Sequence, residues 1–260
     1  MSFCENEGVK VHYEVEGTGP DVILVHGFAS DLESNWRQSG VTDALTDENR
    51  VVMMDCRGHG KSDKPKDPAL YGSKMVDDIT CLLDHLGIEK ANFVGYSMGS
   101  SLCLNLLLMH PERFTSVILG GFVLPDAGAD SGTQRRNVVA EALLADSMEQ
   151  VTNPVGREFR RFAEAMGADL KALAAVQLGS TQNASIRDPE VIVERLRAVS
   201  VPLMTVVGND DFLPGDKSRM AMMVPNGCHF QIEGKDHLTV VPDPKFRMMI
   251  RAFLKHVNSL

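Results

Sequence analysis

The stretch "NFVGYSMGSSLCLNLL", residues 92–107, joins an apolar run to a helical pattern, with a single serine at the join. Gly95 and Gly99 stand two positions before and two positions after Ser97. A strand that turns sharply into a helix forces the turn residue into a strained conformation, and side chains two positions away on either side would collide there. Such a turn holds the serine hydroxyl at its tip, beside a helix N-terminus. The stretch therefore predicts a strand–serine–helix turn, with an ordinary glycine-rich loop as the alternative interpretation.

The flanking sequence supports the first interpretation. Short, nearly continuous apolar runs recur along the chain, at residues 21–25, 51–55, 92–96, 115–122 and 202–208. Such runs are typical of parallel strands that helices cover on both faces. Helical patterns lie between them, at residues 71–88 and 98–110, and a last one covers 244–257. Residues 9–16 alternate apolar and polar side chains, which predicts an antiparallel strand near a sheet edge with one exposed face. We therefore expect a doubly wound α/β domain with a mostly parallel sheet.

One long segment interrupts this alternation. Residues 124–198 contain several helical patterns and no convincing strand, and the strand rhythm resumes at Val201. The simplest interpretation is a core of residues 1–123 and 199–260 with a helical cap, residues 124–198, inserted over the strand ends. We predict that apolar side chains of this insertion line the substrate pocket, namely Met148, Phe159, Phe162 and Met166. Its arginines are interpreted as the solvent side, namely Arg135, Arg136, Arg160 and Arg161.

Composition excludes several classes of protein. The formal net charge is −9, whereas nucleic-acid binding needs a basic patch, so we expect no nucleic-acid partner. No apolar run is long enough to span a membrane, and the N-terminal residues lack a signal-peptide pattern. The five cysteines are widely spaced, with no C-x-x-C pair, which indicates reduced thiols and no zinc site. We expect a cytoplasmic protein with no membrane association, no metal and no cofactor.

A serine hydroxyl is a weak nucleophile and needs a base that an acid orients. Two histidines lie in residues 227–244. His229 falls inside a strand pattern, whereas His237 follows a glycine in a loop before the last helix, so His237 is the predicted base. Asp210 and Asp211 both follow the strand pattern of residues 202–208. Either could supply the acid, and either could instead cap a helix ahead of Pro214.

The order serine, aspartate, histidine is the chain order of the α/β-hydrolases. The sequence resembles that family almost end to end, through five motifs in the family's order: "VILVHGFAS" (22–30), "DCRGHGKSD" (55–63), "GYSMGS" (95–100), "GNDD" (208–211) and "GKDH" (234–237). The resemblance implies an acid three residues after Gly208, which selects Asp211. Asp126 is a less favoured alternative. It comes just after the strand that precedes the helical insertion, a location where the acid also occurs in this fold.

The resemblance also implies an oxyanion hole made by the backbone N–H groups of Phe28 and Met98. One departure is Ser100, where many relatives have a second glycine. Branches of the family with an aspartate nucleophile are excluded by Ser97.

The remaining branch contains serine carboxylic-ester hydrolases, and the chain resembles small esterases, lactonases and haloperoxidase-like perhydrolases. The resemblance therefore implies cleavage of small to medium esters, lactones or thioesters through an acyl-serine, with a small-molecule ester as the only expected partner. The alternatives are an acyltransferase or cofactor-free perhydrolase that uses the same acyl-serine, and a ligand receptor with a vestigial triad. The natural substrate and the oligomeric state stay open.

Overall fold

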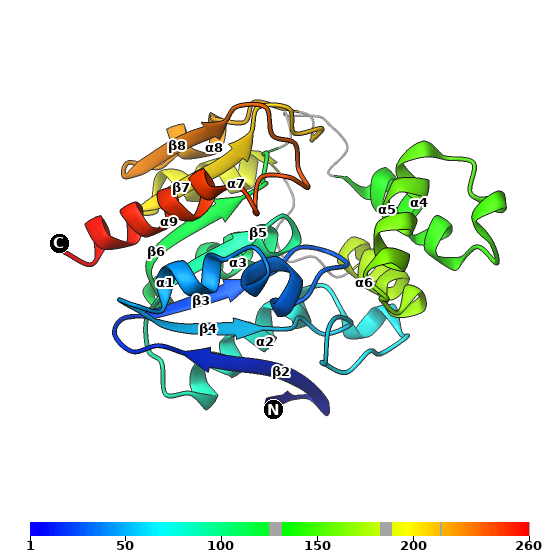
Figure 1. Ribbon diagram of the computed structural model, residues 1–260, viewed down its shortest axis with the longest axis horizontal. Helices are drawn as coiled ribbons and strands as arrows, with labels where there is room; N and C mark the ends of the chain where they lie inside the picture. The colour runs from blue at the N-terminus through cyan, green and yellow to red at the C-terminus, as the bar shows by residue number, and fades with distance from the viewer. Residues whose placement is uncertain (125–131, 183–188, 214, 260) are drawn as a thin grey trace.

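A computed structural model describes residues 1–124, 132–182, 189–213 and 215–259 of the chain. Its centre is an eight-stranded sheet with the order β1-β2-β4-β3-β5-β6-β7-β8. The strands from β4 to β8 in that order run parallel, whereas β1 and β2 are antiparallel to their neighbours. Their bounds are β1 Ser2–Asn6, β2 Val9–Glu16, β3 Asp21–Val25, β4 Arg50–Met54, β5 Ala91–Tyr96, β6 Phe114–Gly120, β7 Leu203–Gly208 and β8 Gly227–Ile232. The predicted mostly parallel α/β sheet is confirmed (Figure 1).

Helices cover both faces of this sheet. One hydrophobic cluster lies under α2 (Ser73–His85), α3 (Met98–Met109), α7 (Pro189–Arg197) and α8 (Arg219–Met223), and a second lies under α1 (Val41–Leu45) and α9 (Pro244–Val257). Successive strand residues alternate between the clusters: Ile23 joins the first, whereas Val22 and Leu24 join the second. Because both faces are buried, the inner strands are apolar at nearly every position.

The antiparallel edge differs from the sequence prediction in two respects. Strand β1, which no sequence pattern indicated, pairs with β2 and takes the edge. His12 is one of the polar residues in the alternating pattern of residues 9–16, which predicts that it faces solvent, but it is fully buried. Its Nδ1 lies 2.9 Å from a carboxylate oxygen of Asp55, and its backbone N–H donates to Ser62. The loop after β4 therefore covers this face, which the local alternation of β2 could not reveal.

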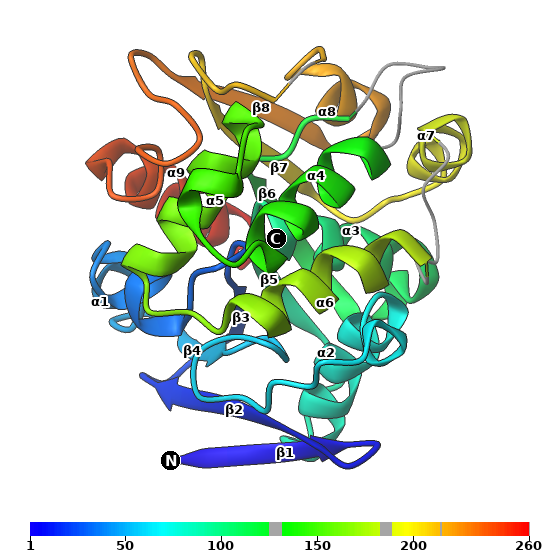
Figure 2. The same ribbon diagram turned by 90° about the vertical axis from the view of Figure 1, so that its right-hand side faces the viewer.

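The described residues of the segment between β6 and β7 form helices joined by turns, with no strand. It contains α4 (Thr133–Leu144), α5 (Pro154–Ala165), α6 (Leu170–Gln182) and α7, with a short 3₁₀ turn, η4 (Met148–Gln150). Helices α4, α5 and α6 stand together beyond one end of the strands, in front of the sheet in Figure 2. Helix α7 instead packs with α3 and α8, where Ile192 and Leu196 join the first core cluster. Short helical turns elsewhere are η1 (Glu33–Arg37), η2 (Pro68–Leu70) and η3 (Pro111–Arg113).

Arg160 corrects one prediction about these helices. The side chain was assigned to the solvent side, but the residue is only 6% exposed. Its guanidinium donates to the carbonyl oxygens of Ala142 and Ala145, at 2.8 and 2.6 Å, and also to Glu164. Arginine satisfies these last carbonyls of α4 because a planar guanidinium presents several donors at once. A periodic sequence pattern treats every arginine as exposed and misses such a contact.

Among the described residues, no helix has both the length and the apolar character that a membrane crossing requires.

Candidate active site

Ser97 lies at the turn between β5 and α3. Its backbone has φ 52° and ψ −107°, a region that side-chain-bearing residues rarely occupy. Its N–H donates to the carbonyl of Gly120 at 2.8 Å. A Cβ at Gly99 would lie 1.9 Å from the carbonyl oxygen of Val25, and a Cβ at Gly95 would lie 2.6 Å from the backbone of Gly99. Both glycines are therefore sterically required, and the predicted strand–serine–helix turn is present.

The structure brings Ser97, His237 and Asp211 into one hydrogen-bonded chain. The Nε2 of His237 lies 2.8 Å from the Oγ of Ser97, and its Nδ1 lies 2.8 Å from Oδ2 of Asp211. The other carboxylate oxygen of Asp211 accepts from the N–H of Leu213 at 2.9 Å. Asp210 is exposed and makes no such contact among the described residues. The alternative acid Asp126 lies outside the described residues.

The loop of His237 is held on two sides. The hydroxyl of Tyr96 donates to the backbone carbonyl of His237, and the two rings lie 5.5 Å apart. Burial, together with the nearby charge of Asp211, raises the pKa of Tyr96 well above its usual value, so the hydroxyl stays protonated and donating. On the other flank, the carboxylate of Asp236 accepts from the N–H groups of Leu238 and Thr239, at 3.0 and 2.9 Å. The candidate base is therefore held in place by its backbone as well as by Asp211.

His229, the rejected candidate base, lies on the edge strand β8. Its Nδ1 is 2.7 Å from the hydroxyl of Thr205 on β7. This contact gives it a structural role within the sheet.

The two predicted oxyanion donors lie on two segments that meet next to the turn of Ser97, the start of α3 and the loop after β3. Met98 is the first residue of α3, and N–H groups of the first helical turn have no acceptor within the helix. Phe28 follows Gly27, whose N–H donates to Asn35 at 2.9 Å and whose Cβ position lies 3.5 Å from the carbonyl oxygen of Tyr96. The loop that carries Phe28 is therefore packed against the residue that precedes the serine.

His26 fixes this loop from behind. Its Nδ1 donates to the carbonyl of Gly27 at 2.7 Å, and its Nε2 accepts from the N–H of Cys56 at 2.9 Å. Burial lowers the pKa of His26, although nearby Asp55 opposes the shift, so a neutral imidazole suits both hydrogen bonds. Its contacts are structural, and it does not reach Ser97 through any hydrogen bond described.

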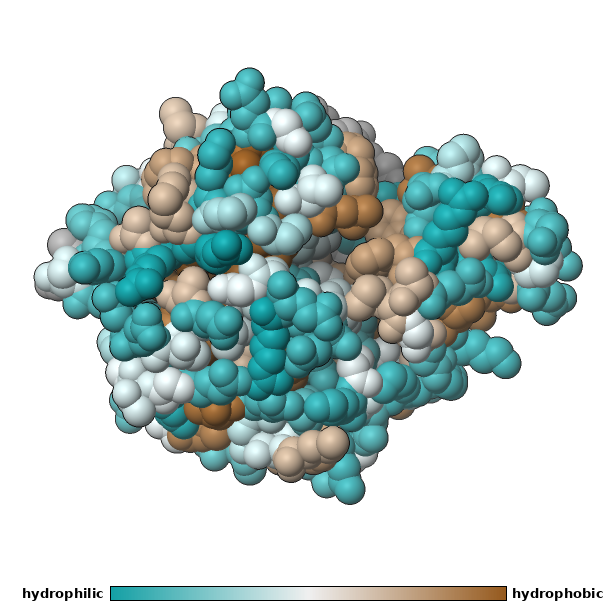
Figure 3. Space-filling model, viewed as in Figure 1, coloured by the Kyte–Doolittle hydropathy of each residue, from teal (hydrophilic) through white to brown (hydrophobic). Residues whose placement is uncertain are grey.

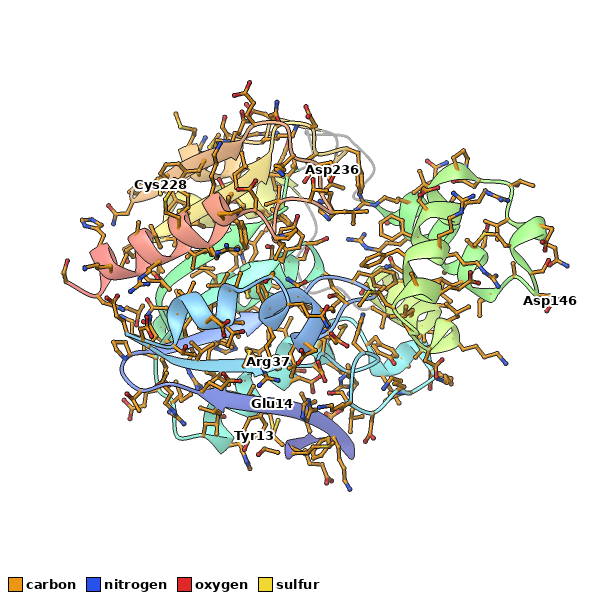
Figure 4. The ribbon with its side chains drawn as sticks, viewed as in Figure 1. Tyr13, Glu14, Arg37, Asp146, Cys228 and Asp236 are labelled. Atoms are coloured by element: carbon orange, nitrogen blue, oxygen red, sulfur yellow. The ribbon has the colours of Figure 1, made fainter. Side chains whose placement is uncertain are left out.

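Three of the four predicted cap residues lie near the loop of Phe28. Phe159 contacts the ring of Phe28 with centroids 6.0 Å apart, and Phe162 packs against the same apolar cluster. Met166 lines an adjoining cavity of about 200 Å³. Met148 lies away from the loop of Phe28. It belongs to η4, two residues from Asp146, and Asp146 lies at the outer end of the cap in Figure 4.

A notch separates the cap from the core, and apolar surface flanks it on both sides (Figure 3). On the core side, Asp236 lies next to this gap (Figure 4). Phe212, which directly follows Asp211, is 55% exposed, and its ring centroid lies 5.1 Å from that of His237. Sequence reasoning missed Phe212 and Tyr96. Their adjacency to Asp211 and Ser97 was the only signal available.

A family model described as the alpha/beta hydrolase fold matches residues 20–157, more than half of the chain. The chain belongs to the α/β-hydrolase fold family. Membership confirms the resemblance that the five motifs indicated. A solved structure of a thermophilic esterase from Thermogutta terrifontis, bound to malate, is 26% identical, with a TM-score of 0.79 over 98% of both chains.

Two curated relatives are similar in sequence to part of this α/β-hydrolase chain. The dihydrolipoyllysine-residue acetyltransferase component of the acetoin cleaving system of Cupriavidus necator is 36% identical over 159 residues, 56% of this chain and 41% of that protein. A 2-hydroxymuconate semialdehyde hydrolase of a Pseudomonas species is 33% identical over 116 residues, 44% of this chain and 40% of that protein. The chain therefore spans less than half the length of these two relatives.

Proposed function

We propose that this α/β-hydrolase is a serine hydrolase that cleaves small to medium carboxylic esters through an acyl-serine. The observation that carries the proposal is the unbroken hydrogen-bonded chain from Ser97 through His237 to the buried Asp211. The esterase named among its structural relatives supports the same reaction class.

The geometry supports the following sequence of steps. His237 takes the proton of Ser97 as the serine oxygen attacks the ester carbonyl carbon, while the carboxylate of Asp211 orients and stabilises the imidazolium. The negative oxygen of the tetrahedral intermediate is held by the N–H groups of Phe28 and Met98. The bond from carbon to the leaving oxygen then breaks, and His237 gives its proton to the departing alcohol. Water repeats the steps on the acyl-serine and releases the acid.

We also propose that the helical insertion selects the acyl group and takes no part in the covalent steps. Phe159 and Phe162 lie over the loop of Phe28, so an acyl chain attached to Ser97 would meet them first. Apolar walls distinguish chain lengths weakly, by about 1–3 kcal/mol per methylene. A graded preference among short and medium acyl esters follows.

A second candidate activity is acyl transfer to an acceptor other than water. One curated relative is named as an acetyltransferase component, and the chemistry of an acyl-serine permits any acceptor that His237 can deprotonate. A ligand receptor with a vestigial triad is disfavoured, because the three side chains are already within hydrogen-bond distance.

The first experiment combines p-nitrophenyl ester hydrolysis with labelling by an organophosphonate. The protein should release p-nitrophenol and gain phosphonate mass at Ser97 alone. Ser97→Ala should lower turnover by about 10⁶, since the triad acts as a unit. An active Ser97→Ala protein, or labelling elsewhere, would refute the proposal.

A matched pair of variants tests the acid. Asp211→Asn keeps the shape but favours the wrong histidine tautomer, with a loss of about 10⁴ in kcat. Asp210→Asn is the control, because that carboxylate is exposed and should change kcat little. Equal losses in the two variants would remove Asp211 from its assigned role.

A further inference from the structure

Two large apolar side chains project into solvent beside the acid and the base. Phe212 follows Asp211 directly and is 55% exposed, and Leu238 follows His237 directly and is 58% exposed. Exposed apolar side chains are common when single, but two that directly follow the proposed acid and base in the chain mark a surface that a ligand could cover. Neither takes part in the proton transfers described above.

Their backbone is held in place, so their positions are defined. The N–H of Leu213 donates to Asp211 at 2.9 Å, which ties down the residue after Phe212. The N–H of Leu238 itself donates to Asp236 at 3.0 Å. The ring of Phe212 lies 5.1 Å from the imidazole of His237 at an interplanar angle of 53°. Tyr96 approaches the same imidazole from the buried side, which leaves Phe212 on the solvent side.

The chemistry of the leaving group places it beside the imidazole of His237, which the ring of Phe212 contacts. The leaving oxygen must accept its proton from Nε2 of His237, so it must come within about 3 Å of that nitrogen. The group carried by this oxygen then lies next to the imidazole, on the side where Phe212 is exposed. The acyl half is directed elsewhere, because its carbonyl oxygen points to the N–H groups of Phe28 and Met98.

We propose that Phe212 and Leu238 form a subsite for an apolar alcohol, both as the leaving half of the ester and as an acyl acceptor that competes with water. The inference rests on the proposed acyl-serine at Ser97. In the transfer step His237 takes the proton of the alcohol, the alcohol oxygen bonds to the acyl carbon, and the bond to Ser97 Oγ breaks. The proton then returns to Ser97, so the products are a new ester and the free enzyme.

The experiment measures how the acyl-enzyme partitions between water and an added alcohol. The protein is supplied with p-nitrophenyl butyrate and either benzyl alcohol or methanol at equal concentration, and the ratio of butyrate ester to butyric acid is measured by chromatography. This ratio belongs to the acyl-enzyme alone, so it does not depend on how much of a variant is folded. The unmodified protein should give a higher ratio with benzyl alcohol than with methanol.

Phe212→Ala should lower the benzyl ratio by about tenfold, the factor that corresponds to about 1.4 kcal/mol, and should leave the methanol ratio unchanged. Leu238→Ala should act in the same direction. Phe230→Ala is the matched control, because Phe230 is an exposed phenylalanine on the edge strand β8 and should change neither ratio.

Three outcomes would overturn the subsite. They are an unchanged benzyl ratio in both Phe212→Ala and Leu238→Ala, an equal fall for benzyl alcohol and methanol, and butyric acid as the sole product of the unmodified protein. Failure of the proposed function looks different, because no p-nitrophenol is then released and Ser97 takes no phosphonate. In that case the subsite proposal fails together with the proposed function.

Discussion

Replacing Ser97 with glycine should make the protein more stable than replacing it with alanine. Both variants lose the serine oxygen and its contact with His237, so the difference between them isolates the backbone. At φ 52° and ψ −107° a residue with a Cβ is strained, whereas glycine is not. Such strain is worth about 1–3 kcal/mol.

Glycine also has a disadvantage that opposes this gain. The unfolded chain of the glycine variant is more flexible, which lowers the unfolding free energy by about 0.5–1 kcal/mol relative to the alanine variant. The net effect is that Ser97→Gly should exceed Ser97→Ala by about 1 kcal/mol in unfolding free energy. For a chain of this size that corresponds to a rise of about 2–4 °C in Tm.

Urea unfolding at neutral pH measures both variants, and Ser101 supplies the control. Ser101 lies within α3, where glycine should be less stable than alanine by about 1 kcal/mol. The sign of the glycine–alanine difference should therefore invert between positions 97 and 101. If Ser97→Ala proves as stable as Ser97→Gly while the control behaves as stated, the turn stores no strain and the reasoning is wrong.

Three further outcomes follow from buried polar groups. Burial, and then nearby His26, lowers the pKa of His59 to about 3, whereas the unfolded value is about 6.5. Stability should be complete above about pH 6.5 and fall as the pH drops toward 3, by about 2 kcal/mol at pH 5, because the unfolded chain then binds one more proton. Urea unfolding at several pH values gives the slope of unfolding free energy against pH. His59→Asn should reduce this slope by the contribution of about one proton, and an unchanged slope contradicts the assignment. Arg160→Met should leave two carbonyls of the cap unpaired, at about 1–3 kcal/mol each, and accelerate hydrogen exchange in α4 and α5 but not in the sheet. Uniform exchange across the chain would argue against it. Tyr96→Phe should leave the carbonyl of His237 without its donor, lower the unfolding free energy by about 1–3 kcal/mol and reduce kcat more than it changes KM. An unaltered kcat would show that this hydroxyl does not position the base.

Local patterns were sufficient to predict every described strand except β1, the main helices and the turn at Ser97. Burial on both faces leaves continuous apolar runs, and a sharp turn excludes side chains at Gly95 and Gly99, so each constraint acts on neighbouring residues and is visible in a short window. The predicted final helix, residues 244–257, coincides with α9 for the same reason.

The contacts between distant residues were decided by the tertiary structure. His237 reaches Ser97 across 140 positions and Asp211 across 26, and the sheet order that brings them together is not a local property. Family motifs pointed to these residues, but no pattern indicated that Phe212 and Tyr96 would meet the same imidazole. His12 and Arg160 were assigned to solvent for a related reason. Whether a polar side chain is buried depends on which segment folds over it and whether that segment supplies a hydrogen-bond partner, and neither can be read from the residue's own neighbours.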